Sequence, residues 1–112
     1  MAKLTGQDAT IEATDSAVLA YTVTDDGLST GTPKDLSSGS ATWIMTSAAG
    51  TVTVTKTTDD GIVISGASSE VVTVTLTTTD TAVTAGAYTG DLQVTDSASQ
   101  TRTVATGTIT IT

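Results

Sequence analysis

The sequence has no cysteine and no histidine among its 112 residues. Without cysteine the chain can form neither a disulfide nor a thiolate metal site, which excludes a secreted scaffold built on disulfides. Without histidine, a serine or cysteine nucleophile has no imidazole partner, so catalysis of that type is excluded. Asparagine is also absent, and with it any N-glycosylation acceptor. We expect no enzymatic activity and no cofactor.

Aromatic residues are scarce, since the chain has no phenylalanine, one tryptophan (Trp43) and two tyrosines (Tyr21 and Tyr88). The core must therefore consist mainly of valine, isoleucine, leucine and alanine. We expect the isolated chain to lie toward the low end of the usual stability range of about 5–15 kcal/mol. Burial of further surface between subunits would stabilise such a protein.

Positive charge is the third shortage. The net charge is −8, and the four basic residues are scattered as Lys3, Lys34, Lys56 and Arg102. Nucleic-acid backbones and anionic membrane surfaces attract clustered lysine and arginine, so neither is an expected partner. No segment approaches the roughly 20 apolar residues of a membrane span. The N-terminal stretch MAKLTGQDATIEATDSA has no apolar core, so we do not expect a secretory signal there.

Threonine is abundant, with 29 of 112 positions. It alternates strictly with valine or leucine over residues 51–55 and 72–77, which predicts strands with one apolar face and one threonine face. Such half-buried strands are typical of antiparallel sheets. Further strands are expected over residues 9–14, 17–24, 40–46, 62–65, 87–95 and 100–112. Seven or eight short strands about ten residues apart predict a β-sandwich or a small barrel.

The organisation expected is a single domain over residues 1–112, in which residues 1–16 form an N-terminal arm or an edge strand. Trp43 and Met45 share one face of their strand, as do Tyr88, Leu92 and Val94, and we assign both faces to the core; an exposed, partner-binding Trp43 is the alternative. In the last strand, Val104 and Ile109 would face opposite sides of a regular strand. We therefore predict a bulge or bend at Gly107.

The tetrapeptide TDDG occurs twice, at residues 24–27 and 58–61. Glycine supplies a positive φ and aspartate tolerates the left-handed region, so tight turns between strands are predicted at both places.

A pair of carboxylates in these stretches could serve a glycosidase, but few aromatic side chains are present to bind a sugar. Neither stretch has the acidic spacing of an EF-hand, although a calcium site shared between loops stays open. Its candidate ligands are Asp25, Asp26, Asp59, Asp60 and Asp96. We assign no catalytic, cofactor-binding or metal-binding residue.

The threonine-rich outer faces have two interpretations. They can be the solvated surface of a sheet, or flat neutral surfaces that suit assembly with other sheets. Lysine and proline residues on edge strands prevent pairing with other chains, and this sequence has few lysines and one proline. The strand edges therefore favour pairing with another subunit.

Three stretches carry a resemblance: DLSSGSATWIMT (35–46), VVTVTLTTTDTAVTAGAYTGDLQVTD (71–96) and TVATGTITI (103–111). In this order they resemble immunoglobulin-like domains of tailed-bacteriophage structural proteins, including baseplate upper proteins and capsid or tail decorations. The resemblance implies an all-β, immunoglobulin-like antiparallel sandwich of about seven to eight strands. It transfers no catalytic or ligand-binding residue, because members of this group act by binding other virion proteins.

The function implied is a non-enzymatic virion structural protein, above all a capsid decoration or cement protein that stabilises the phage head. Its partners would be the major capsid protein or other virion proteins, and its location the virion, after synthesis in the bacterial cytoplasm. The resemblance also implies a homo-oligomer, with a trimer favoured. Two alternatives stay open: a tail, baseplate or fibre-attachment protein, and a carbohydrate-binding or adhesive module.

Overall fold

Alternation of apolar residues with threonine favours strands, and the part of the chain that the structure describes contains eight of them. The structure is a computed structural model that describes residues 7–24, 36, 37, 39–67, 69–95 and 101–112. The strands are β1 (Ala9–Ile11), β2 (Ala17–Thr22), β3 (Ser40–Ser47), β4 (Val52–Thr58), β5 (Gly61–Ser65), β6 (Val71–Leu76), β7 (Gly86–Thr95) and β8 (Thr101–Ile111). No helix occurs in these ranges. The predicted all-β class is therefore confirmed.

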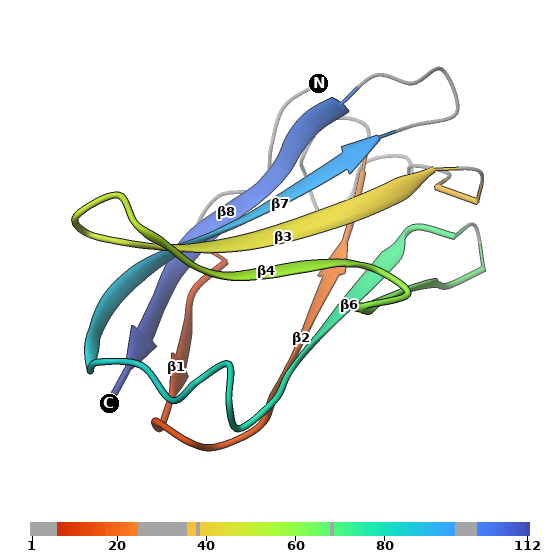
Figure 1. Cartoon of the computed structure of the whole chain (residues 1–112). Helices are drawn as coiled ribbons and strands as arrows, with labels where there is room; N and C mark the ends of the chain where they lie inside the picture. Colours follow the sequence, from red (N-terminus) through yellow and green to blue (C-terminus); the bar gives the residue numbers. More distant parts are fainter. Residues whose placement is uncertain (1–6, 25–35, 38, 68, 96–100) are drawn as a thin grey trace.

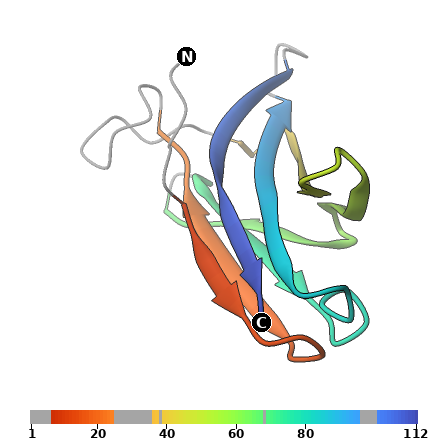
Figure 2. The same ribbon diagram turned by 90° about the vertical axis from the view of Figure 1, so that its left-hand side faces the viewer.

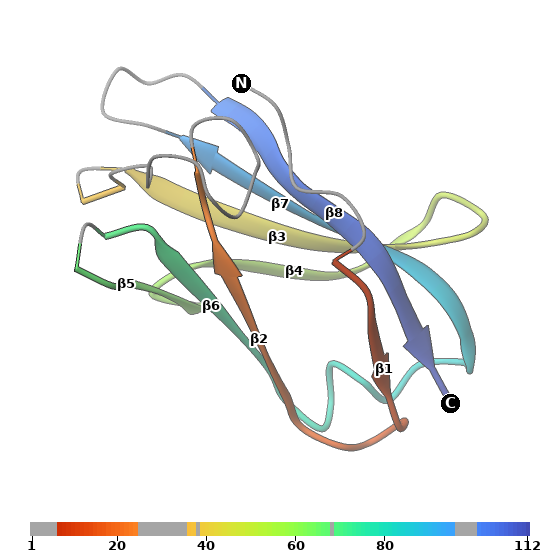
Figure 3. The same ribbon diagram turned by 180° about the vertical axis from the view of Figure 1, so that it is seen from behind.

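All eight strands belong to one mixed sheet, in the order β1-β8-β7-β3-β4-β5-β6-β2. The sheet curls into a nearly closed barrel, with β8, β7, β3 and β4 on one side and β5, β6 and β2 on the other (Figures 1 and 3). Most neighbours are antiparallel, but β1 runs parallel to β8, and two parallel residue pairs join β4 to β5. The two edge strands are β1 and β2; β1 lies between β2 and β8 in Figure 3, and Figure 2 shows β1 overlapping β2 beside β8.

The core fills the space between the two sides of the curled sheet. Trp43 and Met45 on β3 are fully buried, as the alternation predicted, so the exposed alternative for Trp43 is wrong. From the opposite side, β6 contributes three fully buried side chains, Val72, Val74 and Leu76. The same parity is confirmed on β7, where Leu92 and Val94 are buried and Tyr88 nearly so.

Val52 departs from the predicted pattern. Strict alternation places it on the same face as Val54, yet Val52 is 53% exposed and Val54 is buried. The cause is a register shift between β3 and β4, where Met45 pairs with Val54 but Thr46 pairs with Val52. Thr53 is the extra residue of this bulge, and its hydroxyl donates to the Met45 carbonyl at 3.1 Å.

The irregularity predicted at Gly107 lies three residues earlier in the chain. Leu92 pairs with Ala105 and Gln93 with Thr103, so Val104 is the extra residue of a bulge in β8. This bulge allows Val104 and Ala105 to be buried in succession. Pairing is regular at Gly107, so the predicted position was wrong.

Gly107 has a different role, because the segment that precedes β1 passes close to it. A Cβ atom at position 107 would come within 2.0 Å of the backbone oxygen of Gln7. The Gln7 amide also donates to the Thr106 carbonyl at 3.2 Å. Glycine at this position therefore permits the close approach that leads the chain into β1.

Candidate functional site

The second TDDG stretch forms the corner between β4 and β5. Asp59 has φ +66° and Gly61 has φ +93°, both in the left-handed region. The Asp59 amide donates to the Ile62 carbonyl at 3.1 Å, and Thr57 and Asp60 exchange backbone hydrogen bonds. The carboxylates of Asp59 and Asp60 are exposed at this corner. The predicted turn is thus confirmed for residues 58–61, while the first TDDG stretch is outside the described residues for all but Thr24.

Of the candidate calcium ligands, the structure describes Asp59 and Asp60. Asp25, Asp26 and Asp96 lie outside the described residues. Within the described ranges, no three acidic side chains gather into a group that could hold a metal ion.

One ion pair is partly buried, and sequence reasoning missed it. The Lys56 ammonium lies 2.8 Å from a carboxylate oxygen of Asp80, and the two side chains are 13% and 18% exposed. Lys56 pairs with the inward-facing Trp43, so its side chain starts from the inner face of β4. Its parity with Val54 was the signal that could have revealed this.

Asp80 also closes the turn that follows β6. Its carboxylate accepts a hydrogen bond from the Thr77 amide at 2.7 Å, while the Asp80 amide donates to the Thr77 hydroxyl at 3.2 Å. Burial raises the pKa of the Asp80 carboxyl, but the hydrogen bonds from Lys56 and Thr77 outweigh burial and leave the pKa below its usual value. The charged carboxylate is therefore the form that the fold stabilises.

We expect Asp80→Asn to lower the free energy of unfolding by about 1–3 kcal/mol at pH 7, because a shielded ammonium loses its counter-charge. The pKa of Asp80 is lower in the folded state than in the unfolded chain, where it is about 3.9. The ionised carboxylate therefore stabilises the folded state at pH values above about 3.9, and this stabilisation is lost as pH falls through the folded pKa. Urea denaturation should therefore show a difference between the two proteins at pH 7 that shrinks below about pH 4. Asp60→Asn, at an exposed carboxylate, is the matched control. An equal difference at pH 2 and pH 7 would contradict the ion-pair explanation.

Two aromatic side chains meet across the barrel. The Trp43 Nε1–H on β3 donates to the Tyr21 hydroxyl on β2 at 3.0 Å. Burial raises the pKa of the Tyr21 hydroxyl, and the negative charge of Asp91 adds to this effect, against the hydrogen bond from Trp43. The contact joins strands that are not neighbours in the sheet, so it is architectural.

The segment between β6 and β7 is held by two further hydrogen bonds. The Tyr88 hydroxyl donates to the Thr84 carbonyl at 2.6 Å and so closes the corner at the start of β7. The buried Thr81 hydroxyl donates to the Asp15 carbonyl at 2.7 Å and so ties this segment to the loop between β1 and β2. Residues 15 and 81 are too far apart in sequence for any local pattern to predict this contact.

One surface consists of outward side chains on β3, β7 and β8, which we call the threonine face. Strand register brings them into rows, for example Thr46, Thr89 and Thr108, or Ile44, Asp91 and Thr106. The full set is Thr42, Ile44, Thr46, Thr89, Asp91, Gln93, Thr103, Thr106 and Thr108. Asp91, in the middle row, is its single charged member and accepts a hydrogen bond from the Thr106 hydroxyl.

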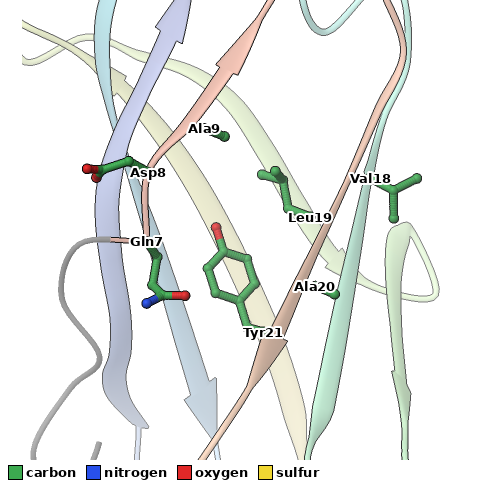
Figure 4. Close-up of a pocket in the computed structure, with 7 residues that line it drawn as sticks. All are labelled: Gln7, Asp8, Ala9, Val18, Leu19, Ala20 and Tyr21. Atoms are coloured by element: carbon green, nitrogen blue, oxygen red, sulfur yellow. The ribbon is translucent and has the colours of Figure 1, made fainter. Parts of the chain in front are cut away.

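Two surface cavities complete the inventory of candidate sites. One, of about 160 Å³, lies between the edge strands β1 and β2; Leu19 and Tyr21 point into this space, whereas Val18 points away from it (Figure 4). The other, of about 280 Å³, lies beside the Asp59 corner and includes Leu36, Val63 and Ile64. Each cavity has one carboxylate in its lining, Asp8 in the first and Asp59 in the second.

No protein-family model and no curated protein matches this sequence. The described residues contain no helix that is both long and apolar enough to cross a membrane. The candidate site is defined by surface geometry, and its main element is the threonine face on β3, β7 and β8.

Proposed function

We propose that the chain is an immunoglobulin-like sandwich that serves as a virion structural protein of a tailed bacteriophage. The strand order supports this fold, because β1, β8, β7, β3 and β4 follow one another on one side and β5, β6 and β2 on the other. The buried Trp43 on β3 and the Tyr88–Thr84 hydrogen bond at the start of β7 are typical of such sandwiches. The resemblance over residues 35–46, 71–96 and 103–111 supports the same fold and the virion role.

Within that role, we favour capsid decoration. The observation that carries this choice is the threonine face, a mainly uncharged surface across three adjacent strands with Asp91 as its single charged member. Threonine offers a methyl group and a hydroxyl group on a stiff side chain, so it can pack and hydrogen bond with little loss of rotamer entropy. A surface of this kind suits contact with the folded surface of another protein.

The mechanism proposed is non-enzymatic clamping. A small domain that buries part of its surface on two neighbouring capsid subunits opposes their separation by the free energy of both contacts. The net charge of −8 would draw the domain toward a basic platform on the shell. The proposed partner is the major capsid protein, bound by a homo-oligomer of this chain.

The test is mass spectrometry and cryo-electron microscopy of purified particles. We expect density for this protein across the shell, in a copy number close to that of the capsid protein. A few copies at one vertex or along the tail would assign it to the tail or baseplate instead. Absence from the particle would refute the virion role.

A binding experiment addresses the threonine face directly. Ile44→Lys, near the centre of the face, should weaken binding to particles that lack the protein by at least about tenfold, because a charge is desolvated in the contact. Ala49→Lys in the exposed turn between β3 and β4 adds the same charge elsewhere and should bind like the wild type. Equal binding of the two variants would show that a different surface makes the contact.

A further inference from the structure

A second ordered surface lies on the opposite side of the molecule, on β2, β6 and β5 (Figure 3). We call it the valine face. Register aligns Ala20 with Thr73 and Thr73 with Val63 in one row across the three strands. Its outward members are Val18, Ala20, Thr22, Val63, Ser65, Val71, Thr73 and Thr75.

The valine face carries two of the three large apolar side chains that are exposed in the described residues. Val18 is 65% exposed and Val63 is 63% exposed, and the third large apolar side chain exposed in the described residues is Val52 on β4. Val18 and Val63 lie on the two outer strands of this face, with Thr73 and Thr75 of β6 between them, so the face presents methyl groups on all three strands.

None of the eight side chains on this face is charged, although the chain as a whole has a net charge of −8. The acids that the structure describes lie outside these eight positions: Asp91 on the threonine face, Asp59 and Asp60 at the β4–β5 corner, Asp80 in the turn after β6, Glu70 directly before β6, and Asp8, Glu12 and Asp15 before or after β1. Two copies of this chain repel each other wherever acidic surfaces meet, and the repulsion is least where charge is absent from both.

We propose that two copies of this chain associate through the valine face, related by a twofold axis. A twofold contact sets the same surface of both copies against itself, so the surface must tolerate its own charges. The threonine face fails this condition, because a twofold axis through its centre would oppose two Asp91 carboxylates. The valine face meets it, since it opposes only valine, alanine, threonine and serine.

A twofold axis running along β6 sets β5 of each copy against β2 of the other. Val63 of one copy then packs near Val18 and Ala20 of its partner. With strands about 4.8 Å apart, a face of three strands is narrow, so the buried area is at the low end for specific complexes. The pair is therefore reversible and depends on protein concentration.

Sedimentation equilibrium of the whole chain, from micromolar to millimolar concentration, tests the proposal. The average mass of the wild type should rise from 11.1 kDa toward twice that value. Val18→Asp and Val63→Asp should each raise the dissociation constant at least about tenfold, because each buries a carboxylate in an apolar contact. Val52→Asp makes the same change at the third exposed valine, away from this face, and should associate like the wild type.

Three results would overturn the proposal. The first is a mass that stays at 11.1 kDa throughout the range. The second is association that Val63→Asp leaves intact, since Val63 lies two strands from the β2 edge and would stay exposed if copies paired edge to edge. The third is a limiting mass three times that of one chain, since a closed trimer needs two different surfaces rather than one.

A dilution series followed by NMR keeps the proposal testable if an aspartate variant fails to fold. Amide shifts that depend on concentration should cluster on β2, β5 and β6 of the wild type; shifts confined to β3, β7 and β8 would refute the valine face. Self-association is independent of where the protein acts. A chain that pairs in solution but is absent from virions would refute the virion role alone. A monomer found on capsids would refute the pairing and the homo-oligomer and leave the virion role standing.

Discussion

Replacing Trp43 with alanine is expected to lower the free energy of unfolding by about 4 kcal/mol. Trp43 is the largest side chain of the core and is fully buried, so its removal leaves a cavity that β-branched neighbours on rigid strands cannot collapse to fill. It also removes the donor that Tyr21 accepts from at 3.0 Å. For a domain of ordinary stability, this loss is a large fraction of the total. Urea denaturation followed by circular dichroism measures it.

A double-mutant cycle separates the cavity from the hydrogen bond. Trp43→Phe keeps an aromatic ring but leaves the buried Tyr21 hydroxyl without its donor. Adding Tyr21→Phe removes that orphaned group, so the second change should be far less destabilising in the Trp43→Phe background than in the wild type. Equal effects in both backgrounds would show that the Trp43–Tyr21 hydrogen bond contributes nothing to stability.

Gly107→Ala is the second change with a large expected effect, about 3 kcal/mol of lost stability. The added Cβ atom would overlap the carbonyl group of Gln7, which is backbone and cannot rotate away as a side chain can. The chain leading into β1 must move, and the parallel pairing of β1 with β8 is lost. Hydrogen exchange should show this locally, because the Ala13 amide donates to Thr112 and the Thr112 amide to Ile11. Both amides should exchange quickly in the variant.

Gly90→Ala is the matched control, since Gly90 pairs directly with Gly107 across β7 and β8. There the added atom meets side chains, at 2.9 Å from both Ile109 and Trp43. We expect a loss of about 1–2 kcal/mol spread over the core, without selective exposure of the Ala13 and Thr112 amides. Rapid exchange of those amides in Gly90→Ala but not in Gly107→Ala would contradict the explanation that a Cβ atom at position 107 displaces β1.

The sequence was informative wherever strand alternation is regular. The inward positions of β6 and β7 and the burial of Trp43 follow from a period of two, because successive side chains on a strand face opposite sides. Alternation fails at a bulge, which shifts the parity by one residue and depends on how two strands pair. For this reason Val52 was misplaced and the bulge at Val104 was expected at Gly107.

Contacts between distant segments were beyond the reach of local patterns. The strand order, the Thr81–Asp15 hydrogen bond and the approach of Gln7 to Gly107 each depend on which strands become neighbours. The Lys56–Asp80 pair is an intermediate case. Parity places Lys56 on the inner side of its strand, but only the fold shows that a carboxylate lies there to meet it. The threonine face and the valine face likewise become visible only when three strands lie side by side.

The parallel pairing of β1 with β8 has a consequence for biosynthesis. Ala9 pairs with Ile109, and the Thr108 amide donates to the Asp8 carboxylate across 100 residues of chain. At about 5–20 residues per second, the first strand emerges from the ribosome roughly 5–20 seconds before its partner does. Since pairing at such sequence separation is also slow to form, β1 is expected to be the last strand to dock. During that interval β1 is on the nascent chain without its partner β8, and its edge is unpaired. High expression temperature should therefore favour aggregation before the chain leaves the ribosome rather than unfolding afterwards.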